Sequence, residues 1–110
     1  MPLNKAKRFD ELPEDPGHEV FEMLAHSRHV RIERILSSGQ GSPETGWYDQ
    51  DWAEWVIVLK GEACICFEND ITVNLSQGDY IYIPPHRRHR VVDTGSKTET
   101  VRLAIHYAGT

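Results

Sequence analysis

The sequence of 110 residues lacks long apolar runs, a basic block and more than two cysteines. No apolar run approaches the roughly 20 residues that a membrane span requires. The basic start, residues 1–8, is followed by no apolar core, so a secretory signal is not expected. These absences predict a soluble, cytoplasmic protein with no membrane partner.

The charge balance is mildly acidic. Lys and Arg total 12 against 17 Asp and Glu, which gives a formal net charge of -5. A chain of this kind without clustered basic residues is not expected to bind nucleic acid. The length suits one domain with its own core and is too short for two.

The two cysteines, Cys64 and Cys66, lie two positions apart in a predicted strand. Their side chains would point the same way, which is a poor geometry for a disulfide between them. A metal thiolate site is the alternative, but no other sulfur ligand lies nearby. We therefore predict that both are small packing residues.

The N-terminal region, residues 1–27, is predicted to be an arm followed by a short helix. Residues 1–15 are polar and interrupted by proline, and Asp15 before Pro16 is a typical helix start. An apolar stripe then includes Phe21 and Leu24. This spacing predicts a short amphipathic helix over 16–26 that covers the rest of the domain.

Residues 28–110 show a different, two-residue period and frequent turn residues. The pattern predicts seven or eight short strands, at about 29–36, 52–60, 62–67, 71–75, 80–83, 89–93 and 101–107. Short strands separated by turns every few residues are typical of an antiparallel sandwich or barrel. The fold class predicted is therefore all-β, with one short N-terminal helix.

The stretch 47–61 places a carboxylate at the start of a strongly apolar strand. On an extended chain, Glu54 lies on the same face as Val56 and Val58. Both faces are apolar after Glu54, so the strand is predicted to be covered on both sides. A carboxylate in such a place must be paired, metal-bound or protonated.

Two motifs in this region resemble those of small single-domain cupins of the cupin-2 type, which fold as RmlC-like jelly rolls, or double-stranded β-helices. The first is Glu54, six residues and Gly61. The second is Gly78, five residues, Pro84, then His86 and His89. The resemblance covers about residues 28–107 and implies a barrel with a site inside it.

The sequence departs from the family pattern at several positions of that site. The two histidines that normally precede the glutamate are replaced by Tyr48 and Gln50, and His86 stands where the family usually has glycine. Of the four usual metal ligands, Glu54 and His89 match by type. The chain also resembles a cupin subgroup with a Trp-Tyr-Asp-Gln segment, which implies no particular reaction.

These residues suggest a divalent-metal site in the barrel, with Gln50, Glu54 and His89 as ligands. The metal could be Zn, Fe, Ni or Mn. Tyr48 and His86 are the catalytic candidates, as proton carriers or as further ligands. The alternative is a buried ion pair between Glu54 and His89 without metal.

Three functions remain open at this point. The protein is either an enzyme acting on a small polar molecule, a module that binds such a molecule without turnover, or a structural or regulatory dimer. Trp55 lies on the strand face opposite Glu54, together with Ile57 and Leu59. This apolar face predicts a homodimer.

Overall fold

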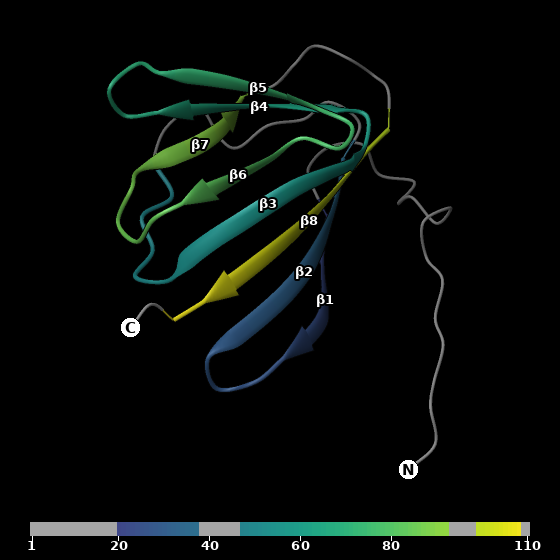
Figure 1. Ribbon diagram of the computed structural model, residues 1–110, viewed down its shortest axis with the longest axis vertical. Helices are drawn as coiled ribbons and strands as arrows, with labels where there is room; N and C mark the ends of the chain where they lie inside the picture. The colour runs from purple at the N-terminus through teal and green to yellow at the C-terminus, as the bar shows by residue number, and fades with distance from the viewer. Residues whose placement is uncertain (1–19, 38–46, 93–98, 109–110) are drawn as a thin grey trace.

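The computed structural model describes residues 20–37, 47–92 and 99–108, and every regular element in these ranges is a β-strand (Figure 1). The strands are β1 (Val20–His26), β2 (Val30–Ser37), β3 (Ala53–Lys60), β4 (Glu62–Phe67), β5 (Thr72–Ser76), β6 (Tyr80–Ile83), β7 (His89–Val92) and β8 (Thr100–Tyr107). Within the described ranges no helix is long and apolar enough to cross a membrane. The predicted all-β fold class is confirmed.

The strands form two antiparallel sheets. One has five strands in the order β1-β2-β8-β3-β6, and the other has three in the order β5-β4-β7. Figure 1 shows β4, β5 and β7 above the diagonal run of β6, β3, β8 and β2. The chain crosses between the sheets after β3, β5, β6 and β7, so residues far apart in the sequence meet across the interior. This is the double-stranded β-helix that the sequence predicts.

All strands predicted after residue 28 are present, with ends that differ by at most one residue. The predicted end of β7 at residue 93 lies outside the described residues. The turns come where Gly, Pro, Asn and Asp cluster, because these residues adopt the backbone conformations that tight turns require. The division of the chain at residues 27 and 28 stays a prediction.

The helix predicted over 16–26 is wrong for the part that the structure describes, because residues 20–26 form β1. Residues 16–19 lie outside the described ranges. β1 pairs with β2, and the register shifts between Met23 and Ala25. This bulge adds a residue, so the apolar positions follow neither face of a regular strand and imitate a helical stripe. Pairing with β2 satisfies the backbone groups along one edge of β1, whereas so short a helix would be marginal by itself.

The core lies between the two sheets. Val58 of β3 and Ile83 of β6 are buried together with Ile65 of β4 and Leu75 of β5. A second buried group joins Ile35, Val56 and Ala104 on the five-stranded sheet. The inner face of β3 is therefore apolar after Glu54, as predicted, and it holds the start of the strand rigidly in place.

Gly61 and Gly78 make the turns that begin β4 and precede β6, and both have a left-handed backbone, with φ of +83° and +91°. At Gly61 a Cβ atom would lie 2.6 Å from Thr100 Cγ2 and 2.7 Å from the Glu99 carbonyl oxygen. At Gly78 it would meet no atom within 4 Å. A substitution at Gly61 therefore meets both backbone strain and a steric clash, whereas one at Gly78 meets backbone strain alone.

We predict that Gly61→Ala lowers the free energy of unfolding by about 2–4 kcal/mol, because strain and clash add. Gly78→Ala is the matched control and should cost about 1 kcal/mol, from the left-handed backbone alone. Urea denaturation of both variants measures the difference. Equal losses would show that the approach of Thr100 to Gly61 does not restrict this turn.

Candidate functional site

A cavity of about 350 Å³ opens between the two sheets. Its apolar wall combines side chains of six strands and includes Phe21, Ile35, Val56, Ile65, Ile83 and Val91. Its polar lining falls into two groups, one around Glu54 and His89 and the other around Glu33 and His106. Arg102 of β8 also lines it.

Neighbouring strands place Glu54 and His106 side by side on the inner face. Glu54 of β3 pairs in register with His106 of β8 and with Ile83 of β6. Partners in an antiparallel register point to the same face of a sheet. Because Ile83 is buried in the core, Glu54 and His106 must point into the cavity.

Glu54 and His89 form a buried pair across the cavity, one from each sheet. His89 Nε2 lies 3.4 Å from Glu54 Oε1. Gln50 Nε2 donates to the same carboxylate oxygen at 2.7 Å, and His89 Nδ1 donates to the Arg87 carbonyl at 2.8 Å. The Arg87 contact fixes the imidazole so that Nε2 faces Glu54.

The pair stabilises the charged forms of both partners. Burial by itself would raise the pKa of Glu54, but hydrogen bonds from His89 and Gln50, with the charge of His106, hold that pKa below its usual value. Burial would likewise lower the pKa of His89, but Glu54 and the Arg87 carbonyl raise it above its usual value. The pair therefore favours an ionised Glu54 and a protonated His89.

The segment that carries Tyr48 and Gln50 is fastened to the turn before β7. The amide of Tyr48 donates to the His89 carbonyl at 2.8 Å, and the amide of His89 donates back at 3.2 Å. The His86 amide donates to the Gln50 carbonyl at 2.7 Å. Tyr48 lines the cavity, with its ring centroid 5.8 Å from that of His89.

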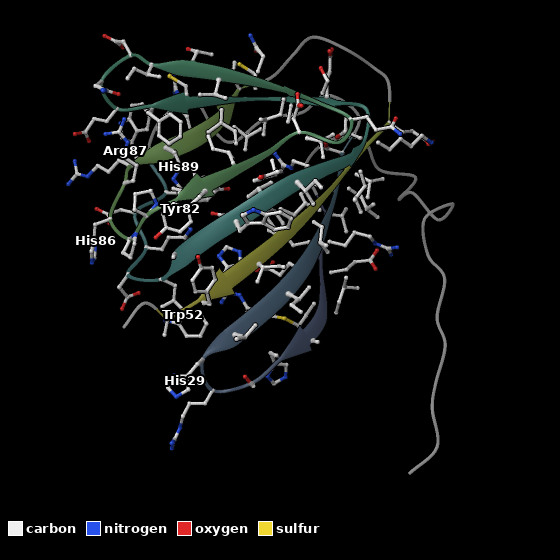
Figure 2. All side chains as sticks on the ribbon, in the orientation of Figure 1. His29, Trp52, Tyr82, His86, Arg87 and His89 are labelled. Atoms are coloured by element: carbon white, nitrogen blue, oxygen red, sulfur yellow. The ribbon has the colours of Figure 1, made fainter. Side chains whose placement is uncertain are left out.

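His86, the other catalytic candidate, lies on the outside of this turn. Its side chain is 68% exposed, and Nδ1 is 2.9 Å from Asp49 Oδ1. Figure 2 shows His86 at the edge of the molecule and His89 further inside. Its φ of +62° is left-handed, which explains why the family usually has glycine there. Arg88 also reaches Asp49, and hydrogen bonds from His86 and Arg88 lower the pKa of Asp49.

The second polar group of the cavity was not predicted. Glu33 of β2 lies between two partners, with its Oε1 2.9 Å from Arg31 Nε and 3.3 Å from His106 Nε2. Burial lowers the pKa of His106, so this imidazole favours its neutral form. The available signal was the alternation of Arg31, Glu33 and Ile35, which places two charges on the face of an apolar core residue. His29 lies on the exposed turn between β1 and β2 (Figure 2).

The donor set for a metal ion is incomplete. The predicted ligands Gln50, Glu54 and His89 do converge, but their polar atoms already bind one another. Within 20–37, 47–92 and 99–108, no three His, Cys, Asp or Glu side chains form a group that could hold a metal ion. One carboxylate, one imidazole and one amide do not fit a tight site without further ligands.

Two facing antiparallel sheets around a cavity define this protein as a jelly-roll barrel. The chain belongs to the cupin family, because the model of the Cupin domain matches residues 35–106. A search of curated proteins finds no match.

Several solved structures resemble this one. A "putative mannose-6-phosphate isomerase" from Ralstonia eutropha JMP134 is 37% identical and has a TM-score of 0.85, over 97% of this chain and 100% of that one. A cupin superfamily protein from Desulfitobacterium hafniense DCB-2 is 20% identical, with a TM-score of 0.76, over 99% of this chain and 95% of that one. An RmlC-like cupin from Desulfovibrio desulfuricans is 17% identical, with the same TM-score, over 96% of this chain and 97% of that one. The last two likenesses show the fold alone.

We predict that His89→Asn lowers the free energy of unfolding by about 3 kcal/mol near pH 6, because Glu54 is left buried without its charged partner. The raised pKa of His89 stabilises the fold below pH 6.5, and this contribution is lost as the pH rises through the folded-state pKa. The lowered pKa of Glu54 stabilises the fold above pH 4.5, and this contribution is lost as the pH falls.

The difference between wild type and His89→Asn should therefore shrink on raising the pH from about 6 to about 9. Urea denaturation in a chelating buffer at several pH values measures it. His29→Asn, on the exposed turn, is the control and should change stability by less than about 0.5 kcal/mol. A difference that stays constant with pH would contradict the charged pair.

Proposed function

We propose that the cavity binds a small polar molecule and that the pair of Glu54 and His89 exchanges protons with it. The observation that carries this proposal is the 3.4 Å contact between a carboxylate and an imidazole that both line the cavity. Their opposite pKa shifts favour an ionised base and a protonated acid. Groups whose pKa values are moved apart in this way are typical of acid–base sites.

The reaction class that uses both groups is isomerisation next to a carbonyl. Glu54 would take a proton from the carbon beside the carbonyl, while His89 donates a proton to the carbonyl oxygen. A proton then returns to the former carbonyl carbon, and the hydroxyl group on the carbon that was deprotonated loses its proton. This completes the isomer without any co-reactant. Tyr48, at the cavity wall, could donate a further hydrogen bond to the substrate. The name of the Ralstonia relative, an isomerase, supports this class.

A divalent metal held by Gln50, Glu54 and His89 is the second candidate. It is supported by the bond from His89 Nδ1 to the Arg87 carbonyl, because metal-binding histidines are usually oriented by such a bond. A bound Zn, Fe, Ni or Mn ion would polarise an oxygen atom of the ligand. Water or ligand would have to complete its coordination. The check is elemental analysis of protein purified without an affinity tag.

We also propose a homodimer through the outer face of the five-stranded sheet. Trp55 packs against Tyr80 with ring centroids 5.3 Å apart, and Tyr80 and Tyr82 are each more than half exposed. Ile57 and its register partner Leu103 extend this apolar face. A second copy with the same face would cover the exposed rings. A monomer in sedimentation at micromolar concentration would refute the dimer; the cytoplasmic location stays a prediction from composition.

The experiment for proton exchange follows deuterium uptake from D₂O by NMR. The panel contains mannose 6-phosphate, fructose 6-phosphate, mannose and fructose, with metal-free and metal-loaded protein compared. At least one compound should gain deuterium at the carbon beside the carbonyl. Glu54→Gln and His89→Asn should each lower the rate about 100-fold, because each removes one proton-transfer group.

His29→Asn is the control and should leave the rate unchanged. Binding without deuterium uptake would show that the cavity binds these compounds without catalysis, and would overturn the proposed proton exchange. Full activity of Glu54→Gln would equally contradict the assignment. A rate that depends on stoichiometric metal, lost in both variants, would favour the second candidate.

A further inference from the structure

The five-stranded sheet carries a row of polar side chains along the inner face. Arg31 of β2 pairs in register with His106 of β8, and His106 pairs with Glu54 of β3. Since adjacent strands are about 4.8 Å apart, the row spans about 10 Å from Arg31 to Glu54. The polar lining therefore reaches well beyond the Glu54 and His89 pair.

Glu33 ties the far end of this row together. Its Oε1 lies 2.9 Å from Arg31 Nε and 3.3 Å from His106 Nε2, so the proton of the neutral imidazole belongs on Nε2. His106 Nδ1 is then an acceptor, and it is buried without a hydrogen-bond partner among the described residues. A buried acceptor left unpaired costs free energy. This end of the cavity is thus incomplete until a donor is bound there.

Charged side chains of both signs line the cavity. Arg31, Arg102 and the imidazolium of His89 stand against two glutamates, Glu33 and Glu54. A strongly charged ligand would bring its charge close to one of like sign wherever it lay. A hydroxyl group suits both ends, because it donates to a carboxylate or to Nδ1 and accepts from a guanidinium or an imidazolium.

The rest of the cavity favours a small ligand with apolar faces. A volume of about 350 Å³ is at the lower end for small-molecule sites. Ile35 and Val56 of the sheet and Val91 of β7 supply aliphatic surface beside the polar groups. Sugars and cyclic polyols combine C–H faces with hydroxyl edges, which matches this division.

We propose that Arg31, Glu33 and His106 form a second binding station in the cavity, the first being the pair of Glu54 and His89. The two stations together select an uncharged, polyhydroxylated molecule such as a free sugar or a polyol. The proposal rests on the proposed function, because both stations line the same cavity. It assigns substrate recognition to residues outside the cupin motifs. It also predicts that a phosphate ester is not the preferred ligand.

Calorimetric titration of the full, metal-free chain tests the proposal. The probes are mannose, fructose, glucose, sorbitol and myo-inositol, together with mannose 6-phosphate and fructose 6-phosphate. At least one neutral compound should bind, and a phosphate ester should bind about tenfold more weakly than its parent sugar. Glu33→Gln and His106→Asn should each weaken the neutral compound about tenfold, because each leaves a hydrogen bond unmade.

Arg31→Met is a second variant for the same station, since the Arg31 side chain is 42% exposed and its replacement should not unfold the barrel. The matched control is Glu62→Gln, at an exposed glutamate of β4 outside the cavity, which should bind like wild type. Circular dichroism confirms that each variant is folded.

Three results would overturn the second station. These are no binding of any neutral probe, a phosphate ester that binds more tightly than its parent sugar, or wild-type affinity in both Glu33→Gln and Arg31→Met. If Glu54→Gln abolishes binding while the Glu33 and Arg31 variants do not, the second station fails and the proposed function stands. If none of the Glu54, Glu33 and Arg31 variants changes binding, the second station and the proposed function both fail.

Discussion

The structure depends on the need to neutralise a carboxylate buried at the start of an apolar strand. Glu54 is 8% exposed and lies next to the core, where an unpaired charge would be far too costly. His89, from the other sheet, and Gln50, from the segment before β3, both turn toward it. Residues of both sheets and of the segment before β3 thereby meet at one point. Such a pair adds little net stability, so a role in binding or catalysis explains its presence better than the fold does.

The surrounding barrel makes that pair available to a ligand. The rigid core on β3 fixes Glu54, and the Arg87 carbonyl fixes the ring of His89. The paired backbones of Tyr48 and His89 hold the segment that carries Tyr48 and Gln50 against the turn before β7. Glu33 and His106 then extend the polar surface along the sheet, so the cavity offers two polar regions separated by aliphatic wall. This division of the cavity is the basis for the proposed recognition of hydroxyl groups at two places.

The sequence was a good guide to the strands and to the first polar pair. The spacings from Glu54 to Gly61 and from Gly78 to His89 can be read within short stretches of sequence. In the structure both glycines lie in turns between strands, and Glu54 contacts His89. The helix prediction failed because the bulge in β1 shifts the apolar positions, and strand pairing outweighs a weak helical pattern. The contact of Glu33 with His106 could not be predicted, because the two residues meet only through the register of β2 with β8. The facing of His86 could not be predicted either, since it depends on a left-handed turn.

The most direct test of the account is NMR of the imidazole nitrogens in ¹⁵N-histidine-labelled, metal-free protein through a pH titration. The account requires that His89 carries protons on both nitrogens at a pH where His106 is already neutral, and that Nδ1 of His89 stays protonated throughout. The opposite order, with His89 losing its second proton before His106, would contradict the charged pair with Glu54 on which the proposed site is built.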